Sequence, residues 1–450
     1  MNRFCYTLLL KAVAPIAFKL LERKAKRAGG VWEIRAPARF GRYEGEMRAQ
    51  SALPTLEAAV EGRPEAFDFA RPVWVHAVSL GETRAAQPLI QALLDQGLAV
   101  LLTHMTATGR TMGASFFESY IRSGQLRQVW IPYDLPAAVK GFLDHWQPRC
   151  GILIEREIWP NLLAEAKAQQ IPMVVVSARF SVSALKQARR MGKVLREAFT
   201  SLALILAQTV EDQKRLQDFG LERVYLGGNL KFDVQVAAPL VKQARQLKQQ
   251  LRRAVVVIAS TRDGEEAMFL EALKKEAALP SPGVSAAAPL YVLVPRHPQR
   301  FGEVAQLFDS SGLNYCRRSE EPDSQALSHC QVLLGDSVGE MFFYYGLADV
   351  AIIGGSFADF GGQNNIEASA LGVPVIVGSH TANFKQAVAD AIAVGAALRC
   401  TSAAEAIGVA RQLLADPRRG QAMRQAAEQW MAQHRGATER TMQYLQPFLK

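Results

Sequence analysis

The sequence predicts an α/β protein with two Rossmann-like, doubly wound domains in tandem. From residue 73 onward, short apolar runs alternate with amphipathic helical stretches, which is typical of a parallel sheet covered by helices on both faces. The alternation pauses near residue 235, and a second series begins near residue 251. The length of 450 residues also exceeds what a single hydrophobic core usually serves.

The chain is expected to divide into four segments. Residues 1–30 form a membrane-anchoring helix with a basic segment, residues 31–234 form the first α/β domain, and residues 251–450 form the second. Residues 235–250 carry no strand pattern and are expected to be a linker that leads into a surface helix. The last helix is a candidate to cross back to the first domain. Ligands of such folds bind in the cleft at the carboxyl ends of the strands.

The anchoring segment contains the stretch FCYTLLLKAVAPIAFKLLERKAKR, residues 4–27, which Lys11, Pro15 and Lys19 interrupt. A clean membrane span has ~20 mainly apolar residues. Residues 1–50 hold eleven lysines and arginines against four acidic residues, and basic clusters beside apolar helices favour anionic membrane surfaces. We therefore expect a helix in the membrane interface, ahead of a spanning helix or an amphipathic helix packed on its own domain. Lys11 disfavours a cleavable signal peptide.

Strand-like runs appear in order in both domains. The runs of the first domain are VWVHAV (73–78), AVLLTHM (99–105), QVWIPY (128–133), CGILIE (150–155), IPMVVVSA (171–178) and LALILAQ (202–208). The runs of the second domain are AVVVIAS (254–260), LYVLVPR (290–296), VLLGD (332–336), DVAIIGG (349–355) and PVIVG (374–378).

Glu82, just after the first run, admits two explanations. Ser79 and Glu82 have the spacing of a capping box, which would give the carboxylate a purely structural role. Glu82 also stands at the first strand-to-helix turn, at the carboxyl edge of the predicted sheet, where Gly81 would let a substrate approach the backbone. A general base at Glu82 therefore stands beside the capping explanation.

Two more charged residues follow strands of the first domain. Glu155 comes after CGILI, and Lys231 comes after LGGN. A surface salt bridge is the ordinary explanation for either residue alone. Three charged residues at the carboxyl ends of one sheet, Glu82 included, favour a reactive site instead.

The second domain carries residues suited to a nucleotide. Arg296 ends a strand, where a guanidinium could clamp a phosphate through two hydrogen bonds. Gly339 and Glu340 begin a helix, and the glycine-rich stretch 354–368 leads into another; free N–H groups at helix starts attract anions. Glu367, one turn into that helix, suits the two hydroxyls of a ribose. Plain tight turns are the alternative for each glycine run.

Other ligand classes are disfavoured. The five cysteines are scattered, without a CxxC pair, so neither a disulfide framework nor a zinc site is expected and a reducing compartment is the simplest interpretation. The chain has no GxGxxG after the first strand, no GxxxxGK[ST] and no HExxH. We therefore expect no metal and no cofactor. The basic excess lies beside an apolar helix, which disfavours nucleic acid as a partner.

With these residues in view, the chain closely resembles the 3-deoxy-D-manno-octulosonic acid (Kdo) transferases of lipopolysaccharide biosynthesis in Gram-negative bacteria. The match runs along almost the whole chain. It consists of the stretches HAVSLGETRAAQPL, TATG, WIPYDLP, ILIEREIWPNL, LGGNLKFD, LVPRHPQRF, GDSVGEMFFYYGLADVAIIGGS, GGQNNIEA and GSHTANFK.

The resemblance implies a metal-independent, inverting glycosyltransferase of the GT-B fold at the cytoplasmic side of the cell inner membrane. It would move Kdo from CMP-Kdo to the tetraacyl lipid A precursor, lipid IVA. The family's proton acceptor falls on Glu82, and its transition-state residues fall on Glu155 and Lys231. The implied CMP contacts are Pro295, Arg296, Val338, Gly339, Glu340, Asn364, Asn365, Ile366 and Glu367.

The chain departs from the family pattern at three positions. Arg156 stands where Thr is common, Gln363 where His is common, and Arg262 where His is usual. None of these removes a proposed catalytic group, but Gln363 cannot carry charge. The alternatives are another GT-B enzyme acting on a soluble nucleotide sugar, which would not need the N-terminal anchor, and a two-lobed binding protein without chemistry.

Overall fold

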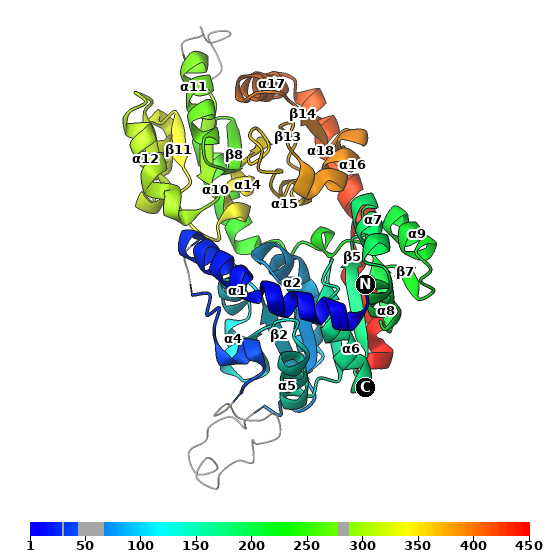
Figure 1. The fold of residues 1–450 in the computed structure, drawn as a ribbon. Helices are drawn as coiled ribbons and strands as arrows, with labels where there is room; N and C mark the ends of the chain where they lie inside the picture. Colours follow the sequence, from blue (N-terminus) through cyan, green and yellow to red (C-terminus); the bar gives the residue numbers. More distant parts are fainter. Residues whose placement is uncertain (29–30, 44–66, 278–287) are drawn as a thin grey trace, which may run out of the picture. The chain divides into compact units, whose positions relative to one another are not determined.

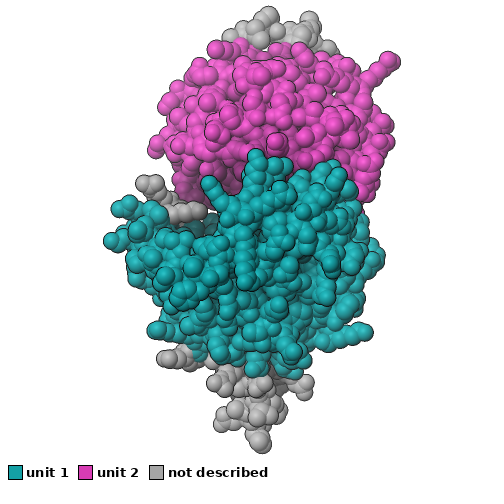
Figure 2. Space-filling view, turned by 45° about the vertical axis from the view of Figure 1, so that its right-hand side comes forward, with its two compact units in different colours: residues 1–233, 436–450 teal, residues 234–435 magenta. Residues whose placement is uncertain are grey.

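The computed structural model describes residues 1–28, 31–43, 67–277 and 288–450. Within the expected anchoring segment, residues 29–30 and the side chains of Lys24 and Arg27 lie outside the described residues. The chain forms two compact units (Figure 2): unit 1 comprises residues 1–233 and 436–450, and unit 2 comprises residues 234–435.

Unit 1 contains a sheet of seven parallel strands in the order β3-β2-β1-β4-β5-β6-β7. Figure 1 shows the helices that surround it. The strands are β1 Val73–His76, β2 Val100–His104, β3 Leu126–Trp130, β4 Cys150–Ile154, β5 Met173–Ala178, β6 Leu204–Ala207 and β7 Val224–Leu226. The helices are α1 Arg3–Ala28, α2 Leu80–Asp95, α3 Ala107–Phe116, α4 Glu118–Arg122, α5 Pro136–Trp146, α6 Pro160–Ala168, α7 Val182–Met191, α8 Lys193–Thr200, α9 Val210–Asp218 and α19 Ala437–Leu445.

The sheet of unit 1 has a core on each face because alternate side chains of a strand point to opposite faces. In β1, Trp74 belongs to one core with residues of α5, α6 and α9. Its neighbours Val73 and Val75 belong to the other core, with residues of α2 and α19. All four residues of β1 are buried, which explains why this strand is a continuous apolar run.

Unit 2 repeats the architecture with seven parallel strands in the order β10-β11-β9-β8-β12-β13-β14. The strands are β8 Val255–Thr261, β9 Leu290–Pro295, β10 Tyr315–Arg317, β11 Val332–Leu334, β12 Val350–Ile353, β13 Val375–Val377 and β14 Ala397–Arg399. The helices are α10 Ala238–Leu251, α11 Glu265–Ala277, α12 Phe301–Asp309, α13 Ser324–His329, α14 Met341–Leu347, α15 Ile366–Ala370, α16 Lys385–Ala393, α17 Ala403–Ala415 and α18 Pro417–His434.

Each sheet has a switch point, where successive connections leave toward opposite edges. In unit 1 it lies between β1 and β4, and in unit 2 it lies between β8 and β12. Open α/β sheets bind their ligands at the carboxyl ends of the strands beside such a point. The predicted fold class of two doubly wound domains is confirmed.

Two segments near the unit boundaries have defined places. Helix α10, within the stretch expected to be a linker, packs on α14 of unit 2. The contact is close: a Cβ added at Gly346 would come within 2.7 Å of the Ala244 side chain. The last fifteen residues, 436–450, belong to unit 1, where Met442 and Leu445 of α19 join the core beside Val75.

Helix α1 packs on unit 1 with one face (Figure 1). The Tyr6 hydroxyl donates to Asp134 Oδ2 at 2.9 Å, and the Phe18 ring lies 4.8 Å from the Tyr133 ring. The opposite face is apolar and exposed, through Phe4, Leu8, Leu9, Val13, Ile16 and Leu20. By length and composition, residues 3–23 could also cross a membrane.

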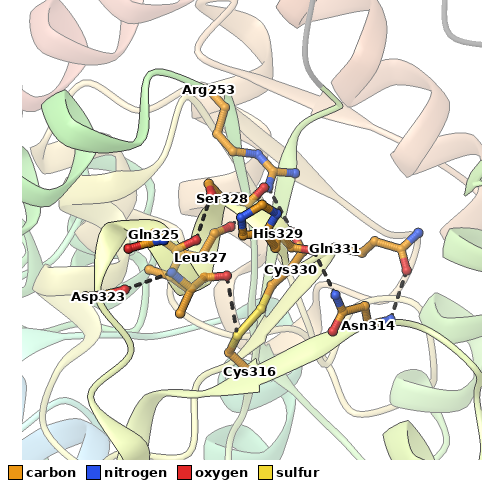
Figure 3. Close-up of a disulfide and its surroundings, with 11 residues drawn as sticks. Arg253, Asn314, Cys316, Asp323, Gln325, Leu327, Ser328, His329, Cys330 and Gln331 are labelled. Carbon is orange, nitrogen blue, oxygen red and sulfur yellow. Dashed lines mark hydrogen bonds between the residues drawn. A yellow bond between two sulfur atoms is a disulfide. The ribbon is translucent and has the colours of Figure 1, made fainter.

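Cys316 and Cys330 form a disulfide in unit 2 (Figure 3). The expectation that the cysteines do not pair is therefore wrong for these two. Cys316 lies in β10, and α13 carries the chain back so that Cys330 comes to lie beside β10, with a Cα–Cα distance of 6.3 Å. The other cysteines, Cys5, Cys150 and Cys400, are free thiols.

Candidate active site

The three charged residues predicted in the first domain gather at the carboxyl edge of the unit 1 sheet. Glu82 lies in the first turn of α2, after β1, and Glu155 directly follows β4. Because β1 and β4 are neighbours at the switch point, both carboxylates lie on the same edge. Lys231 donates from Nζ to Glu155 Oε1 at 2.5 Å, and the two side chains are only 18% and 9% exposed.

Lys231 reaches Glu155 although β7 lies at the far edge of the sheet. The chain after β7 turns back at Gly227 and Gly228, whose N–H groups both donate to the Ala207 carbonyl. Gly228 has φ +90°, and a Cβ at Gly227 would come within 2.7 Å of the Leu206 side chain. The two glycines of the LGGN motif therefore let the lysine cross the end of the sheet.

Glu82 caps α2 and is a weaker acid than an ordinary glutamate. Its Oε2 accepts the N–H groups of Val78 at 2.6 Å and Ser79 at 3.2 Å, so the capping box is formed. Oε1 accepts no hydrogen bond from the residues that the structure describes. Burial, followed by the charges of Glu157 and Glu155, raises the pKa of Glu82 to about 7, although the two backbone hydrogen bonds oppose the rise.

Glu157 is a member of this cluster that was not among the predicted residues. Its Oε2 accepts the Trp159 indole N–H at 2.8 Å, and burial raises its pKa above the ordinary value. It contributes more than Glu155 to the high pKa of Glu82. The available signal was its place two positions beyond Glu155, immediately after a buried strand.

Two buried histidines lie beneath the β1–α2 turn. His104 Nδ1 lies 3.0 Å from the Ala77 carbonyl, so Nδ1 carries the proton and Nε2 can accept from the Gln128 amide at 2.9 Å. Burial lowers the pKa of His104 to about 4 and that of His76 to about 3. Both rings are therefore neutral at neutral pH, and His104 fixes the backbone that leads into the Glu82 cap.

In unit 2 the predicted donor-binding residues follow three strands at one edge of the sheet. Pro295 ends β9 and Arg296 follows it. Val338, Gly339 and Glu340 lie between β11 and α14. The third stretch, Asn364, Asn365, Ile366 and Glu367, begins α15.

Helices α14 and α15 contact one another, which brings the second and third stretches close. Val338 is 68% exposed and Gly339 has φ +83°, so this turn presents its backbone to solvent. Asn365 is fully buried, and its side-chain amide has no hydrogen-bond partner among the described residues.

Arginines form ion pairs with two acidic residues at this edge of the unit 2 sheet. Both Glu340 carboxylate oxygens accept from Arg318, each at 2.9 Å, and Arg318 also lies 4.2 Å from the centre of the Phe343 ring. Arg317 Nε donates to Asp336 at 2.8 Å. Burial alone would raise the pKa of Glu340 and of Asp336, but hydrogen bonds hold both pKa values below the ordinary ones: Arg318 binds Glu340, and the Ser319 hydroxyl and N–H, followed by Arg317, bind Asp336.

The two arginines were missed because they lie at and just after the end of β10, about twenty residues before the carboxylates they bind. Among the described residues, no group of three or more His, Cys, Asp and Glu is placed to hold a metal ion.

Comparisons with known proteins place this chain in one group. Residues 35–234 match the family model described as 3-deoxy-D-manno-octulosonic-acid transferase (kdotransferase). The 3-deoxy-D-manno-octulosonic acid transferase of Bordetella pertussis is 52% identical over 100% of both chains. That of Haemophilus influenzae is 32% identical over 84% of this chain and 87% of its own.

A solved glycosyltransferase from Rickettsia africae is similar in fold alone. It is 12% identical, with a TM-score of 0.54 over 84% of this chain and 99% of that structure.

Proposed function

The chain belongs to the Kdo transferase family, and so is a glycosyltransferase of lipopolysaccharide biosynthesis, and we propose that it moves Kdo from CMP-Kdo to a sugar hydroxyl of the tetraacyl lipid A precursor, lipid IVA. The observation that carries this proposal is the cluster at the carboxyl edge of the unit 1 sheet, where Glu82, with a pKa raised to about 7, lies on the same edge as the Glu155–Lys231 ion pair. A general base works best when its pKa lies near the working pH.

In this proposal Glu82 removes the proton of the acceptor hydroxyl as that oxygen attacks. Its two oxygens would have separate tasks: Oε2 is bound to the N–H groups of Val78 and Ser79, and Oε1 would accept the proton. General base catalysis of this kind contributes ~10² to 10⁴-fold to the rate. Capping therefore holds the base in place and does not compete with catalysis.

Glu155 and Lys231 would act on the donor as a pair. When the bond to CMP breaks, the donor carbon gains oxocarbenium character and the leaving phosphate keeps negative charge. The Glu155 carboxylate would stabilise the former and the Lys231 ammonium the latter. Their ion pair supports this because it fixes both charges before substrate arrives. Attack opposite CMP predicts inversion at that carbon.

CMP would bind to unit 2 through the three stretches after β9, β11 and β12. The Arg296 guanidinium would hold the phosphate. The turn at Gly339 would offer backbone N–H groups to it, and Glu367 would bind the ribose hydroxyls. The Arg318–Glu340 pair supports this assignment because it balances a carboxylate that would otherwise repel the phosphate.

We also propose that α1 lies on the cytoplasmic face of the inner membrane. Its inner face is occupied by contacts such as Tyr6–Asp134, which a helix within the bilayer could not keep. Its outer face presents exposed apolar side chains, among which Lys19 could extend to the headgroups. This supports a helix in the interface over one that spans the membrane, and it would bring the enzyme to a lipid acceptor.

The test is to incubate the purified full chain with CMP-Kdo and lipid IVA in detergent micelles containing EDTA, and to resolve the products by mass. We expect lipid IVA with one or more added Kdo residues, which also gives the number of transfers. A chain that leaves lipid IVA unchanged but converts a soluble nucleotide sugar would contradict the proposal.

A further inference from the structure

A fully buried carboxylate of unit 2, Glu265, binds the glycine-rich loop ahead of α15. Glu265 is the first residue of α11 and is 0% exposed. Its Oε2 accepts the N–H groups of Gly355 at 2.6 Å and Arg262 at 2.8 Å. Its Oε1 accepts the N–H groups of Phe357 at 2.8 Å and Ala358 at 3.3 Å. One side chain thus fixes three backbone positions of a loop about ninety residues away.

The topology explains how one residue can do this. Glu265 follows β8 and the loop follows β12, and these strands are neighbours at the switch point of unit 2. The loop backbone lies against the end of β8: the Gly354 N–H donates to the Ala259 carbonyl at 2.7 Å, and a Cβ at Gly354 would come within 2.7 Å of the Ser260 carbonyl oxygen.

The other end of the loop is fixed to the same point. The Gly362 N–H donates to the Gly355 carbonyl at 2.6 Å, and both glycines have positive φ, +77° and +65°. The Asn383 amide donates to the Phe360 carbonyl at 2.9 Å. Because the loop closes on Gly355, Glu265 sets the position from which the chain continues to Asn364.

Glu266 is also a fully buried carboxylate but has different partners. Both of its oxygens bind Arg300, each at 2.8 Å, and Oε1 also accepts the Thr261 hydroxyl at 2.9 Å. Consecutive positions of one helix therefore carry two buried carboxylates, of which one binds the loop and the other binds Arg300.

We propose that Glu265 is a positioning residue for the donor nucleotide: it holds residues 354–362 in the binding conformation before the donor arrives. A preformed loop spares the donor the free-energy cost of ordering it. This inference rests on the proposed function, in which the residues after the loop bind CMP. Negative charge suits the task, since carboxylates accept several backbone N–H groups strongly.

The test compares Glu265→Gln with Glu266→Gln in the full chain. The Glu265→Gln amide nitrogen cannot accept the loop N–H groups. We expect its Kd for CMP, measured by calorimetry, to rise ~10-fold, and peptides covering 354–362 to exchange their amide hydrogens faster. Glu266→Gln should lower Tm while the Kd for CMP stays within about twofold and the loop stays protected.

Glu265→Asp serves as the conservative variant and carries the test if Glu265→Gln does not fold. Its shorter carboxylate keeps the charge but reaches fewer N–H groups, so we expect a Kd between those of the wild type and Glu265→Gln. Wild-type affinity and wild-type loop protection in the Glu265 variants would overturn the inference. So would equal weakening of CMP binding by Glu265→Gln and Glu266→Gln.

Failure of the wild type to bind CMP would instead overturn the proposed function. Hydrogen exchange without CMP would still show whether Glu265 holds the loop.

Discussion

The carboxyl edges of the two sheets share a topology but differ in how they treat acidic residues. In unit 1, burial raises the pKa of Glu82 and of Glu157, and the charges of Glu157 and Glu155 raise that of Glu82 further, so both pKa values exceed the ordinary one despite their hydrogen bonds. In unit 2, Asp336 and Glu340 have lowered pKa values because hydrogen bonds outweigh their burial: Ser319, followed by Arg317, binds Asp336, and Arg318 binds Glu340. The same architecture thus places carboxyl groups of raised pKa in one unit, where we propose the proton acceptor, and carboxylates of lowered pKa in the other.

The difference comes from where the cations are. Lys231 binds Glu155, and no ion pair is found at Glu82 or Glu157 among the described residues. In unit 2, Arg317 at the end of β10 and Arg318 just after it bind the carboxylates beyond β11. Fold class therefore does not determine reactivity, because strand ends only bring the side chains together and the local charges set the pKa.

The largest expected effect comes from Glu82→Gln. Gln preserves a capping box, so the variant separates the cap from the base. We expect turnover to fall ~100-fold or more while CMP affinity stays nearly unchanged and Tm moves by no more than about 4 °C. Steady-state kinetics with CMP-Kdo and lipid IVA measure this, and Glu118→Gln on the exposed surface of α4 is the matched control. Wild-type turnover in Glu82→Gln would show that Glu82 only caps the helix and is not the base.

The second largest effect should come from Arg318→Met. Met keeps an apolar chain over Phe343 but leaves Glu340 without its bidentate partner. The resulting negative charge would repel the donor phosphate, so we expect the donor KM to rise ~10-fold while kcat changes much less. Arg122→Met, which breaks the exposed pair with Glu118, is the control. A loss in kcat alone would show that the pair does not serve donor binding.

The third prediction concerns Glu157→Gln, which removes one of the charges that raise the pKa of Glu82. The wild-type rate should rise with pH as Glu82 loses its proton, with a midpoint near pH 7, and level off above it. Removing the charge of Glu157 lowers the pKa of Glu82, so the midpoint should move to lower pH. A pH–rate profile in constant ionic strength measures this. An unmoved midpoint would mean that a group other than Glu82 controls the profile.

The smallest effect concerns stability. Because the folded pKa of Glu82 lies above the value of 4.5 for a free carboxyl, the folded chain holds a proton that the unfolded chain releases between about pH 4.5 and 7. The contribution of Glu82 to the free energy of unfolding therefore falls as pH rises through that window. In Glu82→Gln, the fall in Tm between pH 5 and pH 7 should be smaller than in the wild type by about 2 to 4 °C. Calorimetry at these two pH values measures the difference.

Much of the fold follows from local pattern, whereas the site depends on distant contacts. Alternating apolar runs predict both sheets because each strand is buried on two faces. The disulfide between Cys316 and Cys330 and the reach of Arg318 to Glu340 depend on which strands become neighbours, and no local period encodes that. Glu82 and its capping box follow from the local spacing of Ser79 and Glu82, but its raised pKa depends on burial and on Glu157, which only the folded chain brings close.

The return of residues 436–450 to unit 1 has a consequence for how the protein is made. Asp233, where the chain leaves unit 1, accepts the N–H groups of Gly436 and Thr438, where the chain comes back. Met442 and Leu445 then complete a core begun at Val73. On the ribosome, the core of unit 1 therefore cannot be completed until residues 436–450 have been made, after the whole of unit 2, whose own core can close first.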